Sequence, residues 1–379
     1  MITATRLEAA AAAVTVMSNR AEVTDWSARY FGQWWNASSV EASSVCAGAV
    51  LAADVDPEAY AALTLLVHDG RHTDEVEYAR HRMLVARDGE DIIATSPDEA
   101  IAYRSSPASG RLTLSGVGAM ELSLAAARLA REVIRGQLLQ DGWAVLHASA
   151  VVRPEDGATL LAFGGKGAGK TTTAMLLAAS GWQLLANDRV LVRPTGEQGV
   201  EAVPWPSAAA VGLGLLDSLG WGGAARGHVK DGGNFHPTQH DAVTTALLAG
   251  DFTPLWETGK RRERKVQVFP DQFTSLFGVK LATGGRAAAL LFPRVDADAS
   301  PDLVDGPVPV LGDGDFMSGT TEDRYPDVFE LAGGVDGGGR RSARDEVSAR
   351  LALLPHHAVR LSHDVDASAA ALRKAAEAI

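Results

Sequence analysis

Residues 164–173, GGKGAGKTTT, constrain this chain more than any other stretch. An apolar run, ATLLAFGG (158–165), leads into them, and residues 171–180 continue with a helical pattern. Gly164-x4-Gly169-Lys170-Thr171 fits the Walker A pattern completely. Lysine occurs only seven times in the chain, and two of these lysines fall inside this stretch. The pattern predicts a phosphate-binding loop between a buried strand and a helix.

Each residue type in the motif has a chemical role. Glycines let successive backbone N–H groups curl around phosphate oxygens, and the helix N-terminus adds partial positive charge. Lys170 is expected to reach the β- and γ-phosphates, and the Thr171 hydroxyl to ligate Mg²⁺. The expected ligand is a nucleoside triphosphate, ATP, held by Gly164, Gly165, Lys166, Gly167, Ala168, Gly169, Lys170, Thr171 and Thr172. The alternative is a glycine turn that only joins strand to helix, but such a turn does not require Lys-Thr at this offset.

Composition excludes several other functions. The net charge is −12, and nucleic acid normally needs a basic face, so no nucleic-acid partner is expected. The single cysteine, Cys46, excludes an intrachain disulfide and a multi-cysteine zinc site, and is expected to be a small buried hydrophobe. No apolar run approaches the roughly 20 residues that span a bilayer, and residues 8–14 lack the basic start of a secretory signal. A cytoplasmic protein without membrane contact is expected.

The periodicities along the chain predict an α/β protein of two domains. Residues 1–118 are expected to form an N-terminal α/β domain for substrate or partner recognition, and residues 119–379 a P-loop catalytic domain. The predicted strands are 14–18, 48–55, 143–152, 158–165 and 182–188, with a hairpin over 82–96 and helices over 24–35, 120–142 and 171–180. The chain end, 349–379, is expected to run from a helix end through a short strand to a closing helix. Trp26, Trp34 and Trp35 are expected to be packing residues. The Gly-rich stretches 305–315 and 331–342 are predicted loops, the second a candidate for disorder.

The residues around the P-loop match a known arrangement. The string LHASAVV, six further residues, then TLLAFGGKGAGKTTTAMLLAASGWQLLANDRVLV resembles the HPr kinase/phosphorylase family and its bacterial relatives. That family has a histidine strand, a short hairpin to the P-loop, the P-loop helix, and an acidic pair followed by a further strand. Here the histidine is His147 and the pair is Asn187-Asp188. The resemblance covers residues 146–192 and extends more weakly from about 120 to the chain end. It implies a C-terminal P-loop kinase core of the HPr-kinase type.

The resemblance also implies roles for particular residues. In the family the second acid of the pair acts as base on the acceptor hydroxyl, and Asp188 occupies that position. A carboxylate one strand from the P-loop suits this role, because the incoming hydroxyl needs a proton acceptor. The alternatives for Asp188 are a turn residue at a strand end or a metal ligand beside Thr171. His147 is either a core histidine or a contact near the γ-phosphate, so the candidate catalytic residues are Asp188, Lys170 and His147.

Two departures from the family pattern limit what can be transferred. Asn187 replaces an acid, which removes one charge and one metal ligand. Residues 211–217, VGLGLLD, resemble the family signature weakly, with Ala209 and Val211 at its acidic and arginine positions. These departures imply a member of the wider kinase group without the reverse phosphorylase activity. HPr kinases assemble into hexamers, so a homo-oligomer is also an expectation.

Three functions are consistent with these residues. The first is a kinase that transfers the γ-phosphoryl group to a hydroxyl, such as a serine of a peptide or small protein, as tailoring kinases of peptide natural products do. The second is a kinase of a small-molecule hydroxyl. The third is a nucleotide-dependent switch or scaffold, which the sequence disfavours because residues 287–296, AAALLFPRVD, reach Asp296 only after a proline.

Residues 260–265, KRRERK, are the only dense basic run. They are either a solvated turn or a group of cations that faces the transferred phosphate or an acidic substrate.

Overall fold

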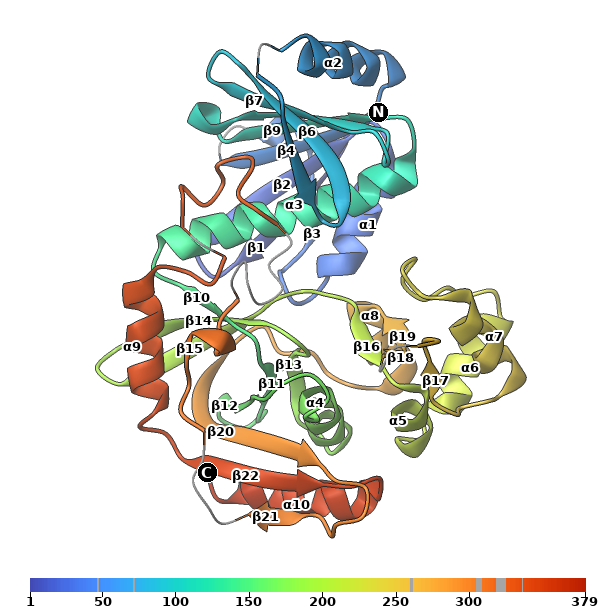
Figure 1. Ribbon diagram of the computed structural model, residues 1–379, viewed down its shortest axis with the longest axis vertical. Helices are drawn as coiled ribbons and strands as arrows, with labels where there is room; N and C mark the ends of the chain where they lie inside the picture. Colours follow the sequence, from blue (N-terminus) through green and yellow to red (C-terminus); the bar gives the residue numbers. More distant parts are fainter. Residues whose placement is uncertain (46–47, 71, 260–261, 305–308, 318–324, 336) are drawn as a thin grey trace. The chain divides into compact units, whose positions relative to one another are not determined.

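The structure, a computed structural model, describes residues 1–45, 48–70, 72–259, 262–304, 309–317, 325–335 and 337–379. The chain divides into two compact units, and each contains a large mixed sheet with helices, as the predicted α/β class requires (Figure 1). The first unit comprises Met1–Val145 and Phe316–Arg344, and the second comprises Leu146–Asp315 and Asp345–Ile379. Cys46 lies outside the described residues, so its predicted burial is not addressed.

The first unit is built on a nine-stranded sheet in the order β3-β1-β2-β4-β9-β8-β7-β6-β5. Strands β2, β4 and β9 run parallel to one another, and the other neighbours are antiparallel. The predicted strands 14–18 and 48–55 and the predicted hairpin 82–96 are confirmed. The bounds are β1 (Thr3–Ala9), β2 (Ala12–Ser18), β3 (Ser38–Val40), β4 (Ala49–Val55), β5 (Asp74–Tyr78), β6 (His81–Asp88), β7 (Asp91–Ser96), β8 (Ile101–Ser106) and β9 (Arg111–Gly116).

Three α-helices belong to this unit: α1 (Ala21–Phe31), α2 (Pro57–Asp69) and α3 (Ala119–Gln140), with short 3₁₀ turns η1 (Ala42–Ser44) and η2 (Pro107–Ser109). Helix α1 ends at Phe31, four residues before the predicted end at residue 35. Gly32, which follows it, adopts a positive φ of 42°. Trp34 and Trp35 are buried, and Trp35 stacks on Phe31 with ring centroids 5.0 Å apart. These two tryptophans therefore pack the core, as expected.

Helix α3 belongs to the first unit, whereas the sequence placed it in the second domain. Its apolar stripe, which includes Leu122, Leu129 and Val133, is buried and packs on β2, β4 and β9. The units divide between Val145 and Leu146 and not at residue 118. The periodicity identifies the apolar face of this helix but does not identify the sheet that covers it.

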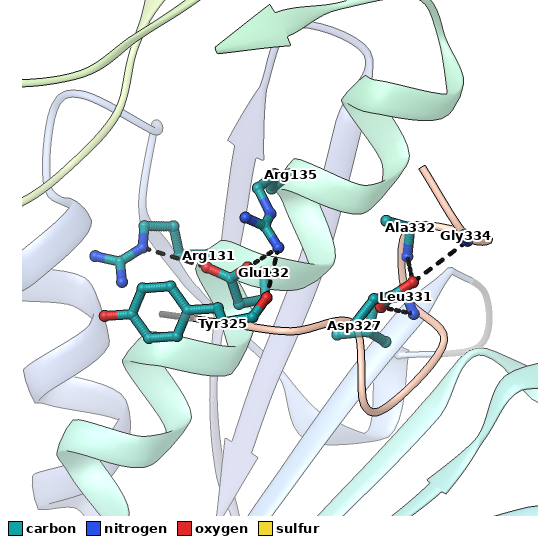
Figure 2. Close-up of polar contacts among 8 residues, drawn as sticks. All are labelled: Arg131, Glu132, Arg135, Tyr325, Asp327, Leu331, Ala332 and Gly334. Carbon is teal, nitrogen blue, oxygen red and sulfur yellow. Dashed lines mark hydrogen bonds and ion pairs between the residues drawn. The ribbon is translucent and has the colours of Figure 1, made fainter. Parts of the chain in front are cut away.

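Residues 325–335, which we call the strap, lie on α3 (Figure 2). Asp327 organises the strap, since its carboxylate accepts hydrogen bonds from the backbone N–H of Leu331 at 2.6 Å and of Ala332 at 3.0 Å. The Tyr325 carbonyl accepts a 3.1 Å bond from the guanidinium of Arg135 on α3. The candidate disorder over 331–342 is therefore wrong for the described residues up to 335.

The strap is also anchored by packing. Phe329 is buried, with ring centroids 5.8 Å from Tyr78 and 5.5 Å from Tyr103, and its carbonyl accepts a 3.2 Å bond from Ser105. On α3, Gly136 leaves room for the strap backbone, because a Cβ there would overlap the Leu331 carbonyl. Buried aromatic contacts and backbone hydrogen bonds thus hold a segment that composition alone describes as a loop.

The second unit contains the predicted P-loop. Its sheet has the order β14-β15-β20-β12-β11-β13, with β22 beside β20 and β21 beside β22. The pairs β12–β20 and β20–β22 are parallel, and the others are antiparallel. The bounds are β10 (Ala144–Leu146, which contains the division between units), β11 (Ser149–Val152), β12 (Ala158–Ala162), β13 (Gln183–Ala186), β14 (Val190–Thr195), β15 (Gly199–Pro204), β20 (Gly285–Val295), β21 (Asp302–Val304) and β22 (His356–Leu361).

Helix α4 packs on β11, β12 and β13, and α10 packs on α4 and β22. Residues 205–282 add helices and two small antiparallel ribbons, β16–β19 and β17–β18. The helix bounds are α4 (Lys170–Ala179), α5 (Leu213–Ser218), α6 (Gly222–Lys230), α7 (Asp241–Ala249), α8 (Pro270–Phe277), η3 (Asp313–Asp315), α9 (Arg341–Leu351) and α10 (Val365–Glu377). The ribbon strands are β16 (Ala209–Val211), β17 (Leu255–Trp256), β18 (Glu263–Arg264) and β19 (Val266–Val268). The predicted helix, strand and closing helix at the chain end are confirmed.

Within the described part of the chain, every helix is too short or too polar to cross a lipid bilayer.

Candidate active site

The predicted phosphate loop lies between β12 and α4. All residues of β12 are buried, and the strand ends at Ala162, just before the loop. The loop backbone needs glycine, because φ is 138° at Gly164, 82° at Gly167 and 108° at Gly169. A Cβ on Gly164 would lie only 2.8 Å from the Cβ of Ala168. The glycines therefore allow a tight turn that ends at the first residue of α4, which is the strand–loop–helix context expected for a P-loop.

Lys170 and Thr171 begin α4, at the place where the first backbone N–H groups of a helix are available to a ligand. Lys170 is 8% exposed, and its amine donates a 2.6 Å hydrogen bond to the carbonyl of Gly164. The amine thus points back to the start of the loop and not to solvent. Of the other predicted nucleotide-binding residues, Gly165, Lys166 and Gly167 are exposed, whereas Gly164, Ala168, Gly169, Thr171 and Thr172 are partly buried.

His147 lies at the same edge of the sheet as the loop. The predicted continuous strand 143–152 is wrong in this respect, because β10 ends at Leu146 and β11 begins at Ser149. Strand β11 is antiparallel to β12, with Ser149 opposite Ala162, so β11 begins where β12 ends. The His147 backbone N–H donates a 2.7 Å hydrogen bond to the carbonyl of Asp315. His147 therefore lies in the break between β10 and β11, and its imidazole contacts Asp188.

Asp188 follows β13, the other neighbour of β11. Its two carboxylate oxygens have different partners: Oδ1 lies 3.3 Å from Nε2 of His147, and Oδ2 lies 2.9 Å from a guanidinium nitrogen of Arg189. The antiparallel pairing of β11 with both β12 and β13 brings His147, the P-loop and Asp188 to one edge. Arg189 was not identified as a site residue from the sequence. Its position directly after the candidate acid was a signal that it could form an ion pair with that acid.

The charges around Asp188 determine its protonation. Burial by itself would raise the pKa of this carboxyl, but the His147 hydrogen bond and the Arg189 charge, with a contribution from Lys170, lower it from 3.8 to about 2. Asp188 is therefore ionised throughout the neutral range. The contribution from Lys170 places the P-loop amine within electrostatic range of this carboxylate.

The residues at this edge fit a nucleotide and Mg²⁺. Side chains at the positive-φ glycines would fill the turn, and Lys170 and the start of α4 offer the positive charge that phosphates need. Thr171 and the ionised Asp188 are oxygen ligands of the kind that Mg²⁺ prefers. Over the described ranges, no three His, Cys, Asp or Glu residues gather as a metal site. Mg²⁺ bound with substrate phosphates does not require such a group, since it uses one or two protein oxygens and keeps several waters.

The structure corrects one argument that the sequence suggested. Strand β20 runs without interruption through Pro293 to Val295 and pairs with β12 in parallel. The N–H of Asp296 donates to the carbonyl of Leu361 in β22 at 2.8 Å, and the N–H of Leu290 donates at 2.9 Å to the carbonyl of Pro355, the residue before β22. Backbone N–H groups alternate between the two sides of a strand, so the nitrogen of Pro293 faces the β12 side and not the β22 side. Strand β12 has already ended at this level, because its last pair is Ala162 with Leu291. The missing N–H of Pro293 therefore costs the β20–β12 ladder no hydrogen bond. An acid, Asp296, therefore does follow an apolar strand next to the P-loop strand.

The described residues of the basic run make local contacts. Arg264 lies in β18 and donates a 3.1 Å bond to His240 at the start of α7. Arg262 contacts Glu257 at 3.5 Å, and Lys265 contacts Glu263 at 3.8 Å. These contacts belong to the β17–β18 ribbon and are consistent with the solvated-turn interpretation. Lys260 and Arg261 lie outside the described residues.

No family model matches the chain, and no curated protein sequence is significantly similar to it.

Proposed function

We propose that the chain is an ATP- and Mg²⁺-dependent phosphotransferase of the HPr-kinase type that transfers the γ-phosphoryl group to a hydroxyl of a peptide or small protein. One observation carries the proposal. A loop with the Walker A residues and an ionised carboxylate, held by His147 and Arg189, lie at one edge of one sheet. A turn that only joined β12 to α4 would need neither the Lys170 amine nor the carboxylate.

The residues divide the work of phosphoryl transfer between them. The loop N–H groups and Lys170 would hold the phosphates, and Thr171 would bind Mg²⁺, which neutralises phosphate charge when bound. Asp188 would accept a hydrogen bond from the acceptor hydroxyl and orient its oxygen toward phosphorus. As the O–P bond forms and the bond to the leaving nucleoside diphosphate breaks, the hydroxyl proton passes to Asp188.

The low pKa of Asp188 bears on the timing of proton transfer. A carboxylate with a pKa of about 2 is a weak base toward a free hydroxyl. In a loose transition state the nucleophile has formed little bonding, and it becomes acidic only as the new bond develops. We therefore assign Asp188 first to orientation and then to late proton acceptance. His147 and Arg189 hold the carboxylate in place for both tasks.

The proposal is tested by incubating the purified chain with γ-labelled ATP, Mg²⁺ and serine-containing peptides or small hydroxyl compounds. Label is expected on an acceptor hydroxyl, with a peptide preferred over a small molecule. The Lys170→Ala variant should lose this transfer. Transfer that persists in the folded variant, or label that appears only as inorganic phosphate, would contradict the proposal.

A nucleotide-dependent switch is the second candidate, and Asp296 is the observation that favours it. An acid after an apolar strand beside the P-loop strand is a feature of switch-type P-loop ATPases. Asp296 is exposed, and its carboxylate accepts a 3.3 Å bond from the N–H of Asp298. If Asp296→Asn abolished slow ATP hydrolysis while Asp188→Asn left it unchanged, the switch would be favoured over the kinase.

A further inference from the structure

The peptide group that precedes Asp188 is held by a buried hydroxyl. Ser149, the first residue of β11, is 1% exposed, and its Oγ donates a 2.9 Å hydrogen bond to the backbone carbonyl of Asn187. That carbonyl and the Asp188 nitrogen belong to one planar peptide unit. A hydrogen bond to this carbonyl therefore restrains the direction in which the chain enters Asp188.

Strand β13, which ends at Ala186, two residues before Asp188, leaves the chain in need of such a restraint. Its pairing with β11 is regular at Val151, which lies opposite Leu184, and then shifts so that Ala150 lies opposite Ala186. Leu185 is thus an extra residue in the ladder. A bulge of this kind bends a strand and re-aims the side chains that follow it. The pairing with β11 ends at Ala186, so among the described residues the ladder does not extend to Asn187 or Asp188.

Two contacts at the start of β11 replace the missing ladder. Ser149 holds the Asn187 carbonyl, and His147, two residues earlier, contacts the Asp188 carboxylate at 3.3 Å. The backbone of His147 is itself held by the Asp315 carbonyl at 2.7 Å. Residues 147–149 therefore hold both the peptide group between Asn187 and Asp188, through Ser149, and the Asp188 carboxylate, through His147. Among the described residues, the titratable and charged groups that act on Asp188 are His147, Arg189 and Lys170.

We propose that Ser149 is a positioning residue: its hydroxyl sets the peptide plane between Asn187 and Asp188 and so holds the Asp188 carboxylate against His147. The tether is a feature of the structure alone, whereas its effect on catalysis rests on the proposed phosphotransfer. The experiment therefore has two separate readouts.

The first readout reports the tether without any activity. Asparagine followed by aspartate occurs once in the chain, at Asn187-Asp188. Protein labelled with ¹³C at asparagine carbonyls and ¹⁵N at aspartate therefore gives one carbonyl–amide NMR correlation, from this peptide. In Ser149→Ala the carbonyl carbon should move upfield, as expected for a lost hydrogen bond, whereas Ser149→Thr should keep the wild-type position. A correlation that does not move in Ser149→Ala overturns the proposal.

The second readout is the split between kcat and KM. Ser149→Ala should lower kcat by roughly 10–100-fold, the scale of a misplacement of about 1 Å, with the KM for ATP nearly unchanged. Ser149→Thr should restore kcat, because it keeps the hydroxyl. Ser105→Ala is the matched control, since it removes a buried serine hydroxyl that donates to the Phe329 carbonyl at 3.2 Å in the first unit, and its kcat should equal that of wild type.

The outcomes separate the two proposals. A fall in kcat that Ser149→Thr does not restore, or an equal change in KM, would overturn the positioning role while phosphotransfer stands. If the wild-type chain transferred no phosphate, the proposed function would fail, and the NMR correlation would still decide the tether. Should Ser149→Ala fold poorly, Ser149→Cys is measured instead, since it replaces the hydroxyl with a slightly larger thiol that is a weak donor. Its Asn187 carbonyl resonance should lie upfield of the wild-type position, and a resonance that does not move would overturn the proposal.

Discussion

The amine of Lys170 donates a 2.6 Å hydrogen bond to the carbonyl of Gly164, so the last part of the P-loop closes on its first residue. The bond keeps the amine inside the turn and gives a buried cation a partner. A phosphate that enters the loop offers the amine a charged acceptor, which forms a stronger hydrogen bond than a neutral carbonyl. The Lys170 side chain therefore joins the two ends of the loop.

Lys170→Ala should reduce phosphoryl transfer by roughly 10²–10³-fold, the scale of a lost electrostatic group, and should weaken ATP binding. Lys280→Ala removes an exposed lysine of the same unit and should leave both unchanged. Transfer rates and calorimetric binding of ATP would be measured for both variants. Equal behaviour of the two would show that the Lys170 amine has no special role.

Thr171→Ala should weaken ATP binding in the presence of Mg²⁺ and have little effect when Mg²⁺ is removed by chelation. The reason is that, under the proposed function, its hydroxyl would be the Mg²⁺ ligand that the loop itself supplies. Calorimetric titration of ATP with and without Mg²⁺ measures both values. If affinity fell equally under the two conditions, Thr171 would not be the ligand.

Asp188→Asn preserves the size of the side chain and removes its charge. Transfer should fall by roughly 10²–10⁴-fold, the usual scale for a lost acid–base group, while ATP binding persists. Asp296→Asn is the matched control, and its transfer rate should be close to that of wild type. A loss of Mg²⁺-dependent ATP affinity as large as the loss of rate would make Asp188 a metal ligand instead.

The pKa of Asp188 also predicts a pH dependence of stability. Because the folded-state pKa of about 2 lies below the unfolded value of 3.8, this carboxylate stabilises the fold fully above pH 4. The contribution is lost as pH falls from 4 toward 2. The difference in Tm between wild type and Asp188→Asn should therefore shrink as pH falls from 4 toward 2. Asp156, whose pKa is also lowered to about 2, titrates in both proteins and cancels in the comparison. A Tm difference that stayed the same from pH 4 to pH 2 would contradict the assignment.

Gly136→Ala tests the strap. Alanine normally stabilises a helix interior by about 0.5–1 kcal/mol relative to glycine, but here its Cβ would overlap the Leu331 carbonyl. The variant should therefore lower the free energy of unfolding and expose the strap to protease. Gly227→Ala, in α6, meets no atom within 4 Å and should show the ordinary gain. If both variants raised the free energy of unfolding, the strap backbone would not pack closely against Gly136 of α3.

The strand, loop and helix over residues 158–179 could be predicted from the sequence, because glycines and Lys-Thr at fixed offsets specify a local structure. Asp188 and His147 were identified by resemblance, but their contact depends on β11 lying between β12 and β13. That order is a tertiary property, and so are the Leu185 bulge and the Ser149 tether. Pro293 misled the interpretation of residues 287–296, because whether a proline interrupts a strand depends on which side its nitrogen faces. Helix α3 belongs to the first unit and not to residues 119–379 as expected, because the periodicity of a helix identifies its apolar face but not the sheet on which that face packs.

The first unit is completed by residues 316–344, which follow most of the second unit in the chain. During synthesis, residues 1–145 leave the ribosome about 180 residues before the strap, a delay of roughly 10–40 s at usual elongation rates. Until then the places that Phe329 and Leu331 will occupy, beside Tyr78 and over Gly136, lack their native covering. The nascent first unit therefore presents an incomplete apolar surface while the phosphate-loop unit is being made, and its final packing must come after the P-loop strand and helix are already available to fold.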